Sequence, residues 1–295
     1  MQYECPVCES ASRQFNKYYR KCVACDLIFA PDRKTDPNLF TEAYLGHVSE
    51  AAMTAFADRM IRAPSLHHLS EPKAALTISA HQEALEILNT RLSPGSHVLD
   101  IGCSTGVFLR ALRKAGFKPL GCDIAKAPVD FLKAQHYDVY AGSIDEYPPQ
   151  WPEPEAVTSF FVIHHLENPV EFLNKIRAKF PRSLIIISEY YDKGVGFRSP
   201  QTKPPRTLTV WNPKSLHQLL IKVGYKKIIS RQTKALPSEL TIPLARKTYG
   251  TLHRLIPTFA VELYFTARRV LFWPYAFWLR LLGHSYAVLA VAEPD

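Results

Sequence analysis

The chain has 295 residues, 47% of them hydrophobic and 21% charged, so it can bury the core of one large or two modest domains. This composition predicts a folded, soluble protein. The longest uncharged apolar run, Val270 to Leu279, is about half as long as the roughly 20 residues of a membrane-spanning helix, which argues against a transmembrane protein. The first residues lack the basic and apolar regions of a secretory signal, so we expect a cytoplasmic location.

The formal net charge is +9, and the basic excess lies in the C-terminal part of the chain. Residues 1–180 carry 19 Lys and Arg against 21 Asp and Glu, whereas residues 181–284 carry 17 against 4. Such a basic segment suits a nucleic acid, an anionic membrane surface or an anionic small substrate, and the charge alone does not choose among them.

Four of the six cysteines form two Cys-x-x-Cys pairs near the N-terminus, Cys5 with Cys8 and Cys22 with Cys25. At this spacing each pair can present two thiolates from one tight turn, and two such turns complete a tetrahedral zinc site. We therefore predict a structural Zn²⁺ ribbon over residues 1–30. Two disulfides or a redox pair are the alternatives, which the absence of a secretory signal disfavours. A ribbon that reads nucleic acid is a further alternative, although residues 1–40 are nearly neutral.

The rest of the chain divides into segments with different predicted secondary structure. Residues 31–94 are predicted to form a linker and N-terminal helices, near 41–62 and 71–92. Over residues 95–239, short apolar runs alternate with helix-length segments, which predicts an α/β core with a parallel sheet covered on both faces. The strands are expected at His97–Ile101, Pro119–Ile124, Asp138–Ala141, Ala156–Phe161, Leu184–Ser188 and Tyr225–Gln232. The helices are expected near 105–116, 126–136, 168–180 and Pro213–Val223, followed by a helical insertion at 240–284 and a closing strand within 285–295.

The segment from Val98 to Leu109 holds the most informative motif. An apolar strand ends in Asp100, Gly102 and Gly106 follow, and an amphipathic helix begins. In a doubly wound sheet, glycines in this first turn let the backbone approach a nucleotide-like ligand. An acid before the glycines suits a ligand with an amine and a cationic sulfur better than one with phosphates. Asp123 closes the second strand, where a carboxylate can accept hydrogen bonds from both ribose hydroxyls.

With this acid, these glycines, the second acid and the strand spacing, the sequence resembles the class I S-adenosylmethionine-dependent methyltransferases over roughly residues 95–235 and the last strand. The resemblance implies a Rossmann-like, doubly wound sheet of seven strands with the last one antiparallel, and S-adenosyl-L-methionine as cofactor. It implies these cofactor-binding residues: Asp100, Gly102, Cys103, Gly106, Asp123, Ile124, Ser143, Ile144 and Phe161. Cys103 and Cys122 are interpreted as small buried residues rather than nucleophiles.

The catalytic candidates lie at the ends of the fourth and fifth strands. Methyl transfer from a sulfonium is an in-line displacement, so the enzyme must hold the acceptor about 3 to 3.5 Å from the methyl group and manage one proton. His164 or His165 is a candidate general base, because the pKa of histidine lies near working pH. The alternative for His165 is to cap the following helix or to line the cofactor pocket. Glu189, Tyr190 and Tyr191 are the other candidates.

A zinc ribbon ahead of such a domain resembles bacterial enzymes that modify sugar nucleotides, surface polysaccharides and secondary metabolites. We therefore expect O- or C-methylation of an anionic small molecule or of a glycan- or lipid-linked precursor. An RNA methyltransferase that uses the ribbon and the basic C-terminal half is the alternative, and the near-neutral ribbon disfavours it. A non-catalytic scaffold that binds the cofactor is the alternative from another class.

The insertion at 240–284 combines aromatic residues with arginines, most densely at 257–283. Three interpretations stay open. It is a cap over the acceptor pocket or a homodimer interface, a peripheral contact with the inner face of the membrane, or an RNA-contacting surface. Pro274 would kink a continuous helix there.

Overall fold

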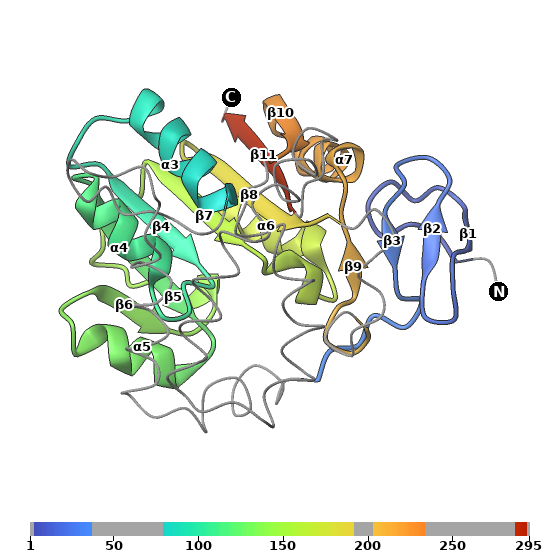
Figure 1. Cartoon of the computed structure of the whole chain (residues 1–295), viewed down its shortest axis with the longest axis horizontal. Helices are drawn as coiled ribbons and strands as arrows, with labels where there is room; N and C mark the ends of the chain where they lie inside the picture. The colour runs from blue at the N-terminus through green and yellow to red at the C-terminus, as the bar shows by residue number, and fades with distance from the viewer. Residues whose placement is uncertain (1–2, 37–78, 192–202, 234–286, 294–295) are drawn as a thin grey trace, which may run out of the picture.

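The computed structural model describes residues 3–36, 79–191, 203–233 and 287–293 (Figure 1). The expected helix at 41–62, the first part of the one at 71–92 and the whole insertion at 240–284 lie outside these residues, so the interpretations of the insertion stay predictions. Within the described ranges, no helix has the length and apolar character needed to cross a membrane.

A seven-stranded sheet forms the centre of the core. Its strands in spatial order are β10 (Lys226–Gln232), β11 (Ala287–Glu293), β8 (Leu184–Tyr190), β7 (Ala156–Phe160), β4 (His97–Ile101), β5 (Lys118–Asp123) and β6 (Asp138–Ala141). The five strands from β8 to β6 are parallel, whereas β11 runs antiparallel to both β8 and β10. The predicted fold class, with its antiparallel last strand, is confirmed. The strand order reverses between β4 and β7, and ligands of doubly wound sheets bind at the carboxyl ends beside such a point.

Helices cover both faces of this sheet, which is why β4, β7 and β8 are buried along almost their whole length rather than at alternate residues. One face packs against α3 (Ser79–Arg91), α4 (Val107–Lys114) and α5 (Lys126–Lys133). The other face packs against α6 (Pro169–Lys179) and α7 (Pro213–Val223). Two one-turn helices, η1 (Ile144–Glu146) and η2 (Ile163–His165), follow β6 and β7.

Several predicted boundaries move by a few residues for local reasons. Helix α4 begins at Val107, because Gly106 adopts a left-handed conformation with φ of 75° and forms its N-cap. Strand β8 extends to Tyr190, because β11 pairs with it as far as that residue. Strand β5 ends at Asp123, so Ile124 lies beyond the strand and is 53% exposed.

The N-terminal ribbon forms a second, antiparallel sheet that includes a strand from the core. Its order is β1 (Ser12–Gln14), β2 (Arg20–Cys22), β3 (Ile28–Phe29) and β9 (Thr209–Val210). Strand β9 lies between β8 and α7 in the sequence and pairs with β3 through Ile28 and Phe29. Figure 1 shows the three blue ribbon strands at one side of the molecule with β9 next to β3. The sequence did not predict β9, because two residues carry no periodicity.

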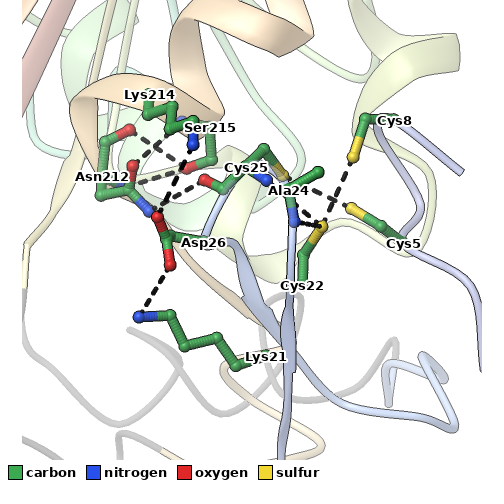
Figure 2. Close-up of polar contacts among 10 residues, drawn as sticks. All are labelled: Cys5, Cys8, Lys21, Cys22, Ala24, Cys25, Asp26, Asn212, Lys214 and Ser215. Carbon is green, nitrogen blue, oxygen red and sulfur yellow. Dashed lines mark hydrogen bonds and ion pairs between the residues drawn. The ribbon is translucent and has the colours of Figure 1, made fainter. Parts of the chain in front are cut away.

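The ribbon also packs against the core through apolar side chains. Trp211, directly after β9, is 1% exposed and lies in the same apolar cluster as Cys25, Leu27 and Phe29. Asn212, the N-cap of α7, donates a side-chain hydrogen bond to the Cys25 carbonyl at 3.4 Å (Figure 2). The ribbon is therefore joined to the core by buried apolar contacts, by the pairing of β3 with β9, and by a hydrogen bond from the N-cap residue of α7.

Candidate functional site

The turn after β4 is built for glycine. Gly102 and Gly106 have φ values of 81° and 75°, in the left-handed region that other residues rarely adopt. A Cβ atom added to Gly102 would lie 2.3 Å from Val162 Cγ2, and one added to Gly106 would lie 2.4 Å from Leu132 Cδ2. The backbone at these two positions therefore follows a path that side chains would block.

Hydrogen bonds fasten this turn to the end of β5. The Cys103 amide donates to the Cys122 carbonyl at 3.0 Å. The Ser104 amide donates to Asp123 Oδ2 and the Ala125 amide to Asp123 Oδ1, both at 2.9 Å. Burial raises the pKa of Asp123. The Asp123 carboxylate is thus oriented by the backbone on both oxygens, and each oxygen keeps a further lone pair for a ligand hydroxyl.

Asp100, at the end of β4, carries a carboxyl group that is almost fully buried. It is 3% exposed, and Thr158 Oγ1 donates to its Oδ1 at 2.8 Å. Within the described residues no cationic side chain pairs with it, and burial raises its pKa to about 7. A buried acid in this state gains from a cationic group placed beside it, because the cation favours the ionised carboxylate.

Three more of the residues expected to bind the cofactor, Ile124, Ser143 and Ile144, follow β5 and β6. Ile124 is exposed, so its side chain is accessible to a ligand. Ser143 is the N-cap of η1, and its hydroxyl accepts from the Asp145 amide at 3.3 Å while Glu146 accepts from the Ser143 amide. Ile144 is 3% exposed and packs into the core, so its backbone rather than its side chain can meet a ligand.

The two core cysteines have the character expected of small buried residues. Cys103 and Cys122 are 5% and 1% exposed, and burial raises the pKa of both thiols, that of Cys122 to about 12. A thiol that stays protonated is a poor nucleophile. Cys103 therefore contributes to the turn through its backbone.

At the end of β7, His164 and Glu189 form a buried hydrogen-bonded pair. The Nδ1 atom of His164 lies 2.6 Å from Oε2 of Glu189, and the Ile163 amide donates to Oε1 of the same carboxylate at 2.7 Å. Because a carboxylate only accepts, His164 Nδ1 is the donor, and in the neutral ring the lone pair belongs to Nε2. This is the arrangement in which a carboxylate orients a histidine base and stabilises the imidazolium that forms.

His165 has different surroundings. Its Nδ1 lies 2.5 Å from the carbonyl oxygen of Arg206 and donates to it. Burial, reinforced by His164, lowers the pKa of His165 to about 3, so its ring is neutral at physiological pH. The cap of the following helix α6 is Asn168 rather than His165. The two adjacent histidines, with ring centroids 3.7 Å apart, are therefore chemically distinct.

Aromatic side chains lie beside this pair. Phe161, with φ of 59°, stacks on Tyr190 at a centroid distance of 4.4 Å, and the Tyr190 ring lies 5.4 Å from that of His164. Tyr190 is 55% exposed, whereas Tyr191 is half-buried and packs against the core. Of the two described rings that contact His164, that of Tyr190 is the exposed one, and the sequence offered Tyr190 together with Tyr191.

Thr158 and Arg206 contribute to the site without having been predicted. Thr158 faces Asp100 across the parallel pair of β4 and β7, and a polar residue inside an apolar strand is the signal that could have revealed it. Arg206 follows a long segment with no strand pattern, and its contribution is a backbone carbonyl, which no residue type reveals.

The four ribbon cysteines converge at one point. Their Sγ atoms all lie within 4.8 Å of one another, with 3.6 Å between Cys5 and Cys25 and 3.4 Å between Cys8 and Cys22 (Figure 2). Zn–S bonds of about 2.3 Å in a tetrahedron place the sulfurs about 3.8 Å apart. A disulfide would need about 2.05 Å. The donor set therefore fits a tetrahedral metal better than it fits two disulfides.

Two backbone amides point at the sulfur of Cys22. The amides of Ala24 and Cys25 point at Cys22 Sγ, at 3.3 and 3.4 Å, as Figure 2 shows. These hydrogen bonds favour the thiolate, whereas burial, which is the larger effect, raises the pKa of the Cys22 thiol. Cys5, Cys22 and Cys25 are buried, so solvent reaches only the side of Cys8.

Residues 66–229 match the protein family described as "Methyltransferase domain". No curated protein matches the chain in sequence. Among solved structures, a chain of the complex that contains the Haloferax volcanii Trm112 methyltransferase activator is 19% identical, with a TM-score of 0.54; the match covers 83% of this chain and 94% of that one. Phosphoethanolamine N-methyltransferase 2 of Haemonchus contortus, in complex with S-adenosyl-L-methionine, is 15% identical, with a TM-score of 0.53 and coverage of 91% and 62%. Coclaurine N-methyltransferase, bound to N-methylheliamine and S-adenosylhomocysteine, is 13% identical, with a TM-score of 0.53 and coverage of 86% and 81%. At these identities the likeness is one of fold.

Proposed function

The chain belongs to the methyltransferase domain family, and from this membership we propose that it binds S-adenosylmethionine at the turn after β4 and methylates an anionic small molecule or a glycan- or lipid-linked precursor. The membership confirms the class of enzyme expected from the sequence. The observation that carries the proposal is the His164–Glu189 pair. His164 lies on η2, which follows β7, and the glycine turn follows the neighbouring parallel strand β4. Both therefore lie at the carboxyl edge of the sheet, where ligands of doubly wound sheets bind.

The residues around the turn fit the proposed cofactor. The left-handed glycines leave room for a ligand to approach the backbone. The buried carboxyl of Asp100 has no cationic neighbour among the described side chains, and it would balance an ammonium or sulfonium group. Asp123 is oriented to accept hydrogen bonds from the ribose hydroxyls.

The proposed chemistry needs one proton acceptor. The bound cofactor supplies an electrophilic methyl group on sulfur. His164 Nε2 takes the proton that the acceptor loses, since Nδ1 is committed to Glu189. Glu189 is held by the Ile163 amide and stabilises the imidazolium. His165 also donates through Nδ1, but burial lowers its pKa to about 3, so its other ring nitrogen is too weak a base to hold the proton at physiological pH.

Two lysines beside Tyr18, in the turn between β1 and β2, support an anionic acceptor. Lys203 Nζ lies 5.2 Å and Lys17 Nζ 5.5 Å from the centroid of the Tyr18 ring, which is 39% exposed. No carboxylate in the described ranges pairs with either lysine. Lys203 lies three residues before Arg206, whose carbonyl accepts from His165. This positive and aromatic surface is suited to a phosphate- or carboxylate-bearing acceptor.

We also propose that Cys5, Cys8, Cys22 and Cys25 hold one Zn²⁺. The four sulfurs would fill a tetrahedral coordination sphere and leave no position for a substrate. The metal would therefore stabilise the ribbon rather than take part in methyl transfer.

The proposed function is tested by transfer of a labelled methyl group from S-adenosylmethionine to fractions of small anionic metabolites, lipid-linked glycans and RNA. We expect label in one of the first two fractions. With the acceptor found, His164→Ala should lower turnover about 10²- to 10⁴-fold while S-adenosylmethionine affinity changes little. His97→Ala, at the opposite end of β4, is the matched control. Label in RNA would favour the RNA methyltransferase, and cofactor binding without any labelled product would favour the scaffold.

A further inference from the structure

The segment 206–210 joins the ribbon to the histidine pair. On the ribbon side, Tyr19 Oη donates to the Thr207 carbonyl at 2.7 Å, across 188 positions of sequence. The Ala30 amide donates to the Leu208 carbonyl at 2.8 Å, next to the pairing of β3 with β9. The ribbon thus holds two consecutive carbonyls of this segment.

The same segment contacts both histidines on its other side. The Leu208 amide donates to the His164 carbonyl at 2.8 Å. The Arg206 carbonyl accepts from Nδ1 of His165 at 2.5 Å. A displacement of residues 206–208 would therefore move η2, which carries both imidazole rings.

These contacts are shielded from water. Tyr19 and Leu208 are fully buried, and Thr207 is 7% exposed. A buried carbonyl that loses its donor finds no water to replace it, so each of these hydrogen bonds constrains the segment. The Tyr19 hydroxyl adds nothing to apolar packing, and its donation to Thr207 is a specific contact that can be removed without removing the ring.

We propose that Tyr19 is a positioning residue for methyl transfer, acting through the Thr207 carbonyl and residues 206–208 to hold His164 and His165 in place. The inference rests on the proposed function, in which His164 is the base. It gives the ribbon a role beyond packing, because the ribbon's own side chain sets the geometry of a site in the core.

The test compares the full-length Tyr19→Phe variant with the wild type, using measurements that need no acceptor. Hydrogen exchange of the Leu208 amide should become about 3- to 10-fold faster, as expected for the loss of one buried hydrogen bond. In ¹⁵N NMR of the imidazole rings, the Nδ1–H signal of His165 should broaden or shift. Tyr3→Phe is the matched control, since the described residues give the Tyr3 hydroxyl no hydrogen-bond partner.

With the acceptor in hand, kcat of Tyr19→Phe should fall about 3- to 10-fold with little change in the KM for S-adenosylmethionine. Unchanged Leu208 exchange and unchanged histidine signals would overturn the inference. A loss of thermal stability with those signals intact would overturn it as well. If the variant does not fold, the test uses the wild type. A His165 Nδ1–H proton that exchanges slowly at pH 7 supports the hydrogen bond from His165 to the Arg206 carbonyl, and a proton that exchanges fast overturns it. A wild-type turnover in His164→Ala would refute the proposed base and leave the exchange result standing.

Discussion

Replacing Asp100 by asparagine should stabilise the ligand-free protein above neutral pH. Burial raises the pKa of Asp100 from the ordinary 3.8 to about 7, so the folded protein binds this proton more tightly than the unfolded chain does. The stability that Asp100 contributes is therefore fully present below pH 3.8, and it is lost as the pH rises towards 7. The difference between the two pKa values corresponds to about 4 kcal/mol at about 1.4 kcal/mol per unit.

Urea unfolding of the wild type and of Asp100→Asn at pH 4, 5.5, 7 and 8 measures this effect. The amide oxygen of asparagine can still accept from Thr158, so the hydrogen bond at 2.8 Å is kept while the charge is removed. Between pH 4 and 8, the free energy of unfolding of the variant should rise relative to that of the wild type by up to about 4 kcal/mol. Asp138→Asn, at an exposed position of β6, is the control and should show no such trend. Parallel pH profiles for wild type and Asp100→Asn would refute the buried, unpaired state of Asp100.

The same titration should appear in cofactor binding. If the ionised carboxylate faces the cationic cofactor, the affinity of the wild type for S-adenosylmethionine should rise about tenfold from pH 6 to pH 8, as the ionised fraction rises. Asp100→Asn should bind more weakly and lose this dependence. An affinity that is flat with pH would place the cationic part of the cofactor away from Asp100.

Two further predictions concern the ribbon and the glycine turn. Metal analysis of the purified chain should find about one zinc, and removing it with a chelator should unfold the ribbon; a folded, zinc-free protein with four reduced thiols would contradict the zinc site. Gly102→Ala should lose about 1 to 3 kcal/mol of stability and most cofactor affinity, because the new Cβ meets Val162 at 2.3 Å in a left-handed backbone. Gly95→Ala is the matched control, with φ of 87° and nothing within 4 Å; an equal loss in both variants would show that the Val162 contact is irrelevant.

The strands and the glycine turn could be predicted from the sequence because their signals are local. The apolar run before Asp100 and the two glycines after it reveal a strand, a turn and a helix within twelve residues. The pairing of His164 with Glu189 is different, since it depends on the register of β7 against β8. The sequence offered both residues as separate catalytic candidates and gave no sign of the hydrogen bond between them.

The docking of the ribbon could not be predicted for the same reason. Strand β9 is only two residues long, and it exists because β3 offers an edge for it. Trp211, which follows β9, is a large apolar residue that could pack anywhere in a core, and only the fold places it against the ribbon.

Part of the charge asymmetry of the chain is balanced by ion pairs in the described residues. Basic residues of the C-terminal half pair with acids of the N-terminal half: Lys214 with Asp26, Lys222 with Glu9, and Arg231 with Glu83. Part of the basic excess therefore joins distant segments of one molecule. The proposal of an anionic acceptor rests instead on Lys17 and Lys203, which both lie beside the Tyr18 ring.

Calorimetry of the full chain with S-adenosylmethionine tests the central claim most directly, because it requires neither the acceptor nor the metal to be identified. We predict one cofactor molecule per chain, with at least a tenfold loss of affinity in Asp123→Ala, whose carboxylate is oriented by the Ser104 and Ala125 amides. Asp130→Ala, at an exposed position of α5, should bind like the wild type. A wild type that releases no heat with S-adenosylmethionine, or an Asp123→Ala variant that binds as tightly as the wild type, would contradict the account.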